Sequence, residues 1–244
     1  MRSITEAAYP PTLELTQTVL YSECFACSFQ MASSSQLSCP IEVERKFVPG
    51  TDVEKTLHGL GAVLLEKVTF RDSYYDSPDV LLTLADFWLR KRDDTWELKH
   101  PPKRGATGFI GGSTQYVEVT QKDEIIHKIS EELGVPCAPS IEAFGLNEFA
   151  SFVTCRRRFQ LPLEENAVTK VVVDLDKADF GFVVGEVEVL VKNQEEVQNA
   201  MLKVEEICRK LGSFRETPVQ GKVSTFLQLH RPEHYKKLME AHKI

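Results

Sequence analysis

Charged and apolar residues alternate along several short segments of the chain, which is the pattern of β-strands whose two faces differ. In the segment 41–47, Glu42, Glu44 and Lys46 share one face, and mostly apolar residues take the other. Three charges on one strand face are unusual, because a sheet normally turns a charged face to water and an apolar face to a core. The segment alone fits either a solvent-facing edge strand or a strand whose charged face turns inward.

The same two-residue spacing recurs along the chain with charges of both signs, which favours the second interpretation. The acids at this spacing are Glu42, Glu44, Glu118, Asp174, Asp176, Glu186 and Glu188. The bases are Lys46, Arg90, Arg92, Lys99, Arg156 and Arg158, with Lys222 just before a C-terminal helical stretch. The residues between them are mostly Val, Leu or Phe, so we expect helices to cover the apolar face while the charged face turns inward.

Hydrophobic periodicity and the turn residues between segments predict the remaining elements. Strands are expected at 41–47, 62–70, 71–78, 87–92, 96–99, 116–120, 151–161, 170–176 and 185–191, with a hairpin turn at 93–95. Helices are expected at 51–61 with Asp52 as its cap, at 122–134, 141–150 and 193–211, and as one or two helices at 218–242 around Pro232. This mixture predicts an α+β fold.

Composition and charge narrow the class of protein. The 244 residues are 42% hydrophobic and 27% charged, which is typical of a globular protein and not of a disordered or fibrous one. The net charge of -7 argues against nucleic-acid or anionic-membrane binding. No apolar run reaches the roughly 18 residues that cross a bilayer. Six scattered cysteines indicate free thiols in a reducing compartment, so we expect a cytoplasmic protein.

We expect a single domain at 39–244, preceded by an N-terminal extension at 1–38 that is disordered or dispensable. The extension lacks the basic start and apolar run of a secretory signal, and it lacks the arginine enrichment of a mitochondrial one. Met31 is an alternative start of the functional chain.

An inward-facing wall of charges requires a sheet that closes round a water-filled or ligand-filled lumen, because isolated buried charges are very costly. Lys and Arg side chains bind phosphate oxygens, and Arg can do so with two parallel hydrogen bonds. Carboxylates repel a polyphosphate unless divalent cations lie between them. Mg²⁺ suits this role because it prefers oxygen ligands and shares its coordination sphere with substrate phosphates. The pattern therefore predicts a polyphosphate-ester site with one or two Mg²⁺ ions.

The motif Glu42-x-Glu44-x-Lys46 resembles the signature of the CYTH superfamily, the triphosphate tunnel metalloenzymes. The motif alone is unspecific, but the ordered set of motifs is specific. The set runs IEVERKF, TFRDSYYDSP, ADFWLRKR, WELK, ASFVT, VDLDKADFG and VGEVE, followed by the Lys222 region. The resemblance extends from Ile41 to about Tyr235. It implies an eight-stranded antiparallel β-barrel tunnel, with helices packed outside, that hydrolyses thiamine triphosphate to the diphosphate and phosphate with Mg²⁺.

By matching position, the resemblance also implies roles for individual residues. The triphosphate would be held by Lys46, Arg90, Arg92, Lys99, Arg156 and Lys222, with Trp88 stacking on the thiamine ring and Glu186 contributing to substrate binding. The metal would be held by Glu42, Glu44, Asp174, Glu186 and Glu188, with Glu118 as an additional carboxylate. Tyr74 and Lys99 are the candidates for water activation, because a lysine crowded by cations can lose its proton and act as a base oriented by a phenol.

Some positions depart from the family pattern or allow other interpretations. Cys155 stands where a Lys is expected before the matched Arg156, and Arg157 and Arg158 replace small residues, so the phosphate clamp on this strand would differ. Charged pairs at this spacing also occur on solvated strand faces, and the position of Trp88 alone favours packing at the core or rim over stacking on a ligand.

Several functions therefore stay open. The chain fits an enzyme acting on another triphosphate on the same barrel, such as an inorganic triphosphatase. It also fits a non-catalytic polyphosphate-binding module and a structural β protein. For the enzyme we expect a small-molecule substrate and a monomeric chain.

Overall fold

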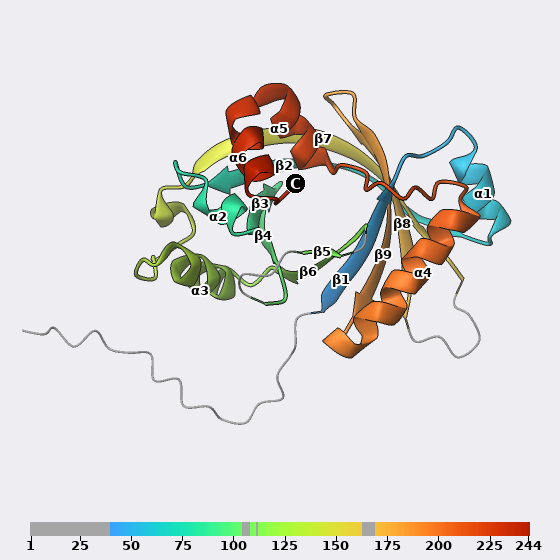
Figure 1. Ribbon diagram of the computed structural model, residues 1–244, viewed down its shortest axis with the longest axis horizontal. Helices are drawn as coiled ribbons and strands as arrows, with labels where there is room; N and C mark the ends of the chain where they lie inside the picture. Colours follow the sequence, from blue (N-terminus) through green and yellow to red (C-terminus); the bar gives the residue numbers. More distant parts are fainter. Residues whose placement is uncertain (1–39, 104–107, 111, 163–168) are drawn as a thin grey trace, which may run out of the picture. The chain divides into compact units, whose positions relative to one another are not determined.

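The strands join into a single antiparallel sheet (Figure 1). The computed structural model describes residues 40–103, 108–110, 112–162 and 169–244, which fall within the compact unit Ser38–Ile244. The strands are β1 (Ile41–Phe47), β2 (Val63–Asp76), β3 (Trp88–Arg92), β4 (Thr95–His100), β5 (Phe109–Ile110), β6 (Ser113–Val119), β7 (Asn147–Gln160), β8 (Val171–Ala178) and β9 (Val183–Val191). The predicted N-terminal extension and part of the loop after β4 lie outside the described residues.

The sheet closes on itself into a barrel. Its strand order is β1-β9-β8-β7-β2-β3-β4-β6, and β1 pairs with β6 to complete the ring. The short β5 pairs with β6 and lies outside this ring. The eight-stranded antiparallel barrel expected from the family resemblance is therefore confirmed.

Helices pack around this barrel. They are α1 (Val53–Gly59), α2 (Leu81–Leu84), α3 (Lys122–Leu133), α4 (Val197–Lys210), α5 (Lys222–His230) and α6 (Pro232–Glu240), with single 3₁₀ turns η1 (Glu142–Phe144) and η2 (Gln194–Glu196). The predicted helices at 122–134 and 193–211 are confirmed, and Pro232 starts the second of two C-terminal helices. None of the described helices is long and apolar enough to cross a membrane.

Three local predictions were wrong. The strands expected at 62–70 and 71–78 are one strand, β2, which runs alongside β7 with an irregularity at Tyr74 and Tyr75. The helix expected at 141–150 is only η1, because the chain from Asn147 onward pairs with β2 instead. Pairing with a neighbouring strand here overrides the local pattern. Asp52 precedes α1, but its side chain makes no capping hydrogen bond.

The apolar outer face of the barrel is covered on two sides. α4 lies along β1 and β9 (Figure 1), and buried residues such as Phe47, Val187 and Val204 fill that interface. α3 covers the side formed by β3 and β4, where Leu98 and Ile129 are buried. The first residues of β2 are not covered, because Val63, Leu64 and Leu65 are exposed. The expected helical cover is therefore incomplete on this side.

The inner face of the barrel carries aromatic side chains under helix α5. Tyr74 of β2 and Phe152 of β7 are buried there, and Phe226 of α5 packs on Phe152 with ring centroids 5.6 Å apart. This apolar contact fixes α5 against the barrel, so it also fixes the residue with which α5 begins, Lys222.

Candidate active site

Strand register determines which side chains share the inner face of the barrel, because directly paired residues of antiparallel strands point to the same side. The pairs are Lys46 with Glu186, Glu44 with Glu188, Glu186 with Asp174, Asp174 with Arg158, Asp176 with Arg156, Arg90 with Tyr74 and Glu97, and Lys99 with Trp88 and Glu118. Ion pairs also join residues of different strands across this face. The barrel thus brings together all the predicted site residues that lie on strands.

One charged cluster surrounds Lys99 on β4. Its ammonium contacts the Glu42 carboxylate of β1 and lies 3.4 Å from Glu118 of β6. Arg90 lies beside it, 2.5 Å from Glu97 and 3.9 Å from Glu118. Each cation of this cluster is thus held by carboxylates.

A second cluster surrounds Arg156 on β7. Its guanidinium donates to Asp176 at 2.7 and 2.6 Å and to Glu186 at 3.2 Å. Lys222 reaches the same two carboxylates from α5, at 3.1 Å from Glu186. Burial alone would raise the pKa of Glu186, but Lys222, Lys46 and Arg156 hold it well below its usual value. Glu186 is therefore a permanent anion within a cationic setting.

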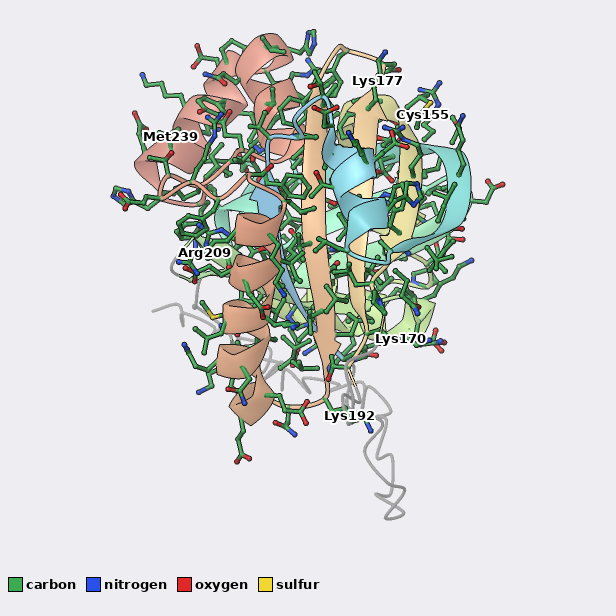
Figure 2. All side chains as sticks on the ribbon, turned by 90° about the vertical axis from the view of Figure 1, so that its right-hand side faces the viewer. Cys155, Lys170, Lys177, Lys192, Arg209 and Met239 are labelled. Atoms are coloured by element: carbon green, nitrogen blue, oxygen red, sulfur yellow. The ribbon has the colours of Figure 1, made fainter. Side chains whose placement is uncertain are left out.

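Strand β7 separates its two extra arginines onto opposite faces. Arg158 points inward and donates to both oxygens of Asp174, at 2.8 and 2.7 Å, and lies 3.7 Å from Glu188. Arg157 points outward and pairs with Glu54 of α1. Cys155 is exposed on the same outer face, where it pairs in register with Lys177 (Figure 2). The departure from the family pattern at Cys155 thus leaves the inner face unchanged, whereas Arg158 adds a cation to it.

Two carboxylates of the inner face, Asp72 and Glu97, were not predicted from the sequence. Asp72, fully buried, accepts two hydrogen bonds from Arg92 at 2.8 and 3.0 Å. Glu97 accepts from Arg90 at 2.6 Å. The available signal was the two-residue spacing, since Asp72 precedes Tyr74 and Glu97 precedes Lys99 at that interval.

Three of the inner carboxylates occupy neighbouring positions on β1 and β9. Glu44 and Glu188 are register partners on β1 and β9, and Glu42 is two residues from Glu44. Burial and the charge of Glu42 raise the pKa of Glu188 to about 8. Burial, Glu44 and Glu118 raise the pKa of Glu42 despite its contact with Lys99. Negative charge is thus insufficiently balanced at this point, which fits a cation with oxygen ligands.

The inner carboxylates that the structure describes do not have the geometry of a metal site. Across residues 40–103, 108–110, 112–162 and 169–244, no group of three acidic, histidine or cysteine side chains has metal-binding geometry. Asp174 and Glu186, both predicted metal ligands, are instead engaged by arginine and lysine. These two residues would have to release their cations before contacting a metal.

Lys99 and Tyr74, the predicted catalytic pair, have separate neighbours in the structure. Burial alone would lower the pKa of Lys99, but Glu42, Glu44 and Glu118 outweigh it and raise the pKa above its usual value. The crowding by cations expected for Lys99 is thus outweighed by its carboxylate neighbours. Tyr74 lies beside Arg90, and within the described part of the chain no hydrogen bond joins it to Lys99.

Trp88 lies on the inner face beside Lys99, and its indole N–H donates to Asp86 at 2.8 Å. The residue is only partly buried and borders the charged cluster. The interpretation of Trp88 as a core residue is therefore disfavoured.

Comparisons with known proteins agree with this geometry. Residues 40–221 match the CYTH domain. The chain is 43% identical over 211 residues to a thiamine-triphosphatase of Macaca fascicularis, covering 82% of this chain and 90% of that protein. It is 42% identical over 209 residues to the thiamine-triphosphatase of Homo sapiens, with the same coverage. A protein of Pyrococcus horikoshii has the same fold at 21% identity, with a TM-score of 0.50 over 78% of this chain and 99% of its own. The chain therefore belongs to the CYTH domain family.

Proposed function

We propose that this protein hydrolyses thiamine triphosphate to thiamine diphosphate and phosphate. The observation that carries the proposal is a closed barrel whose inner face holds a cation set and a carboxylate set together. A triphosphate needs the first set, and a divalent metal needs the second. The name shared by the similar mammalian proteins supports thiamine triphosphate as the particular substrate.

Substrate binding would proceed by exchange of ion pairs. The proposed triphosphate ligands are Lys46, Arg90, Arg92, Lys99, Arg156 and Lys222, to which Arg158 is added because of its inward position. Each of these cations contacts a carboxylate in the ligand-free barrel. Phosphate oxygens can replace those carboxylates without leaving a buried cation unpaired, and a divalent cation would then pair with the released carboxylates.

The carboxylates released in this way would hold Mg²⁺. Glu42 and Glu188 fit best, because burial and neighbouring carboxylates raise their pKa values, and Glu44, Asp174 and Glu186 complete the proposed set. When bound, the metal would neutralise charge on the phosphates and on these carboxylates.

Lys99 and Tyr74 stay the proposed pair for activating water. In the ligand-free barrel Lys99 keeps its proton because three carboxylates surround it. We propose that Lys99 first binds the triphosphate as a cation. Once Glu42 no longer pairs with it, Lys99 would lose its proton to solvent and could then accept one from the attacking water, with Tyr74 beside Arg90 orienting that water.

The same proposal extends to the setting of the enzyme. We propose a monomer that acts on a small molecule in the cytoplasm, without nucleic-acid or membrane partners. The free thiols of Cys137, Cys155 and Cys208 support a reducing compartment. We also propose that residues 39–244 form the whole catalytic domain and that residues 1–38 are dispensable.

Phosphate release from thiamine triphosphate, inorganic triphosphate and ATP tests the proposal, each with Mg²⁺ and with EDTA. We expect metal-dependent release that is fastest from thiamine triphosphate. Arg90→Ala and Glu42→Ala should abolish turnover while circular dichroism shows the fold intact. Wild-type rates in either variant contradict the assignment of the site.

The alternatives give different results in the same assay. An inorganic triphosphatase on this barrel would release phosphate from inorganic triphosphate and not from the thiamine ester. A non-catalytic polyphosphate-binding module would bind these compounds by calorimetry without releasing phosphate.

A further inference from the structure

Asp86 connects three parts of the chain that border the charged site. One of its carboxylate oxygens accepts hydrogen bonds from the Trp88 indole N–H and from the Tyr116 hydroxyl, each at 2.8 Å. Its other oxygen accepts from the backbone N–H of Gly108, also at 2.8 Å. Asp86 is 1% exposed, so it cannot itself contact a ligand in the lumen without displacing a ring.

The two rings held by Asp86 flank the ion pair at the centre of the proposed site. Trp88 is the register partner of Lys99, and Tyr116 is the register partner of Glu42. Lys99 and Glu42 contact each other. The rings therefore lie on the inner face immediately beside the group proposed to bind the triphosphate.

The local backbone is adapted to this arrangement. Asp86 has a φ of +66°, in the left-handed region that residues other than glycine adopt uncommonly. Gly108 lies so close to Tyr116 that a Cβ at this position would be 2.3 Å from the ring. A conformation of this kind persists only where the surroundings maintain it, and it is often found at functional sites.

We propose that Asp86 is a positioning residue that fixes the Trp88 and Tyr116 rings as the binding surface for the organic group of the substrate. Two aromatic faces backed by a carboxylate favour a flat cationic ring, such as a thiazolium. Asp86 would thereby set the preference for a cationic heteroaromatic triphosphate over inorganic triphosphate. This inference rests on the proposed function, because it concerns the substrate of the same site.

Steady-state kinetics of Asp86→Ala and Asp86→Asn test the proposal, with thiamine triphosphate as substrate and inorganic triphosphate as competitor. For Asp86→Ala we expect KM for thiamine triphosphate to rise about tenfold with kcat nearly unchanged, which corresponds to the loss of one or two hydrogen bonds. The inhibition constant of inorganic triphosphate should change less than about twofold. Asp86→Asn keeps an oxygen for both rings and should restore most of the affinity. Asp79→Asn, an exposed carboxylate before α2, is the matched control.

Fluorescence provides a readout that does not depend on turnover. The chain has two tryptophans, so a Trp96→Phe background leaves Trp88 as the reporter. Asp86→Ala should make Trp88 more accessible to acrylamide, and Asp79→Asn should not. A quenching curve unchanged by Asp86→Ala, or equal losses of affinity for both triphosphates, would overturn the proposal.

The two levels of inference can fail separately. If the wild-type protein binds thiamine triphosphate without hydrolysing it, the proposed function fails. Dissociation constants measured by Trp88 quenching for the two triphosphates then still decide the role of Asp86. A tenfold change confined to thiamine triphosphate supports it, and equal changes reject it.

Discussion

Lys222 lies 3.1 Å from Glu186 although the two residues come from different layers of the molecule. Glu186 is on β9 of the barrel, and Lys222 begins helix α5, which packs on the aromatic side chains of the inner face. The same ammonium contacts Asp176 of β8. A cation from the C-terminal helices thus completes the charged inner face, and the position of α5 becomes part of the site.

Lys222→Ala should weaken both the site and the fold. Its removal leaves Asp176 and Glu186 with less compensation in a buried position, a change that costs about 3 kcal/mol in comparable cases. We expect a large rise in KM for the triphosphate and a lower midpoint in urea unfolding. Lys222→Met retains most of the apolar stem and separates the effect of charge from that of packing. A variant with normal KM would show that Lys222 is only structural.

Binding of Mg²⁺ should strengthen as the pH rises towards 8. Glu188, with a pKa of about 8, and Glu42, whose pKa is also raised, must lose their protons before they can bind a metal. Calorimetry in two buffers of different ionisation enthalpy, at pH 6.5 and 8.5, should detect proton release that is larger at the lower pH. Glu188→Gln should reduce this release. Equal release from both proteins would exclude Glu188 as a ligand.

The raised pKa of Glu188 also makes the free energy of unfolding depend on pH when no metal is added. A carboxyl whose pKa is raised on folding contributes stability that is fully present below its unfolded value of 4.5 and is lost as the pH rises through about 8. Compared with Glu188→Gln, the wild type should therefore lose free energy of unfolding as the pH rises across this range. Urea denaturation without metal at pH 5, 6.5 and 8 measures it.

The two-residue spacing of charges was sufficient to predict the inner face because strand pairing preserves sides. Once Glu44 lies inward, its register partner Glu188 must do so as well. The closure of β1 on β6 has no local signal, and it was expected only from the family resemblance. The inward position of Arg158 followed from the spacing, but its contact with Asp174 required the fold.

Other features depend on contacts that no local pattern encodes. Asp86 lies in a turn before β3, and its contact with Tyr116 bridges 30 positions along the chain. The segment after Ile141 has apolar residues that suit a short helix, but Asn147 begins a strand because β2 offers a partner. The protonation of Lys99 was misjudged because its carboxylate neighbours come from β1 and β6.

A buried hydrogen-bond chain should make the docking of helix α6 sensitive to acid. Asp76 accepts from the Thr83 hydroxyl at 2.7 Å, and that hydroxyl lies 2.8 Å from His234 Nε2. Burial lowers the pKa of His234, partly opposed by Asp76, with Lys237 and Arg231 also lowering it. A histidine with a lowered pKa contributes stability that is present above its unfolded value of about 6.5 and lost as the pH falls through the folded value.

His234→Gln should therefore lose stability mainly near neutral pH. We expect it to be about 1 kcal/mol less stable than wild type at pH 7.5, with the difference shrinking towards pH 5. Thermal or urea unfolding at both values measures this. His127→Gln, which replaces an exposed histidine on α3, is the control and should track wild type. A difference that stays constant with pH would mean that only packing was lost.

Arg157 and Arg158 offer a matched test of the inner face, because they are adjacent on β7 and point to opposite sides. Arg158 pairs with the buried Asp174, and Arg157 pairs with the half-exposed Glu54. We expect Arg158→Ala to reduce kcat/KM for the triphosphate by about tenfold or more, since a charge-assisted contact is worth about 1.5–3 kcal/mol. Arg157→Ala should leave kcat/KM within about twofold, because exposed ion pairs contribute little.

If both variants behaved alike, either the assignment of Arg158 to the triphosphate would fail or the outer face would be coupled to catalysis.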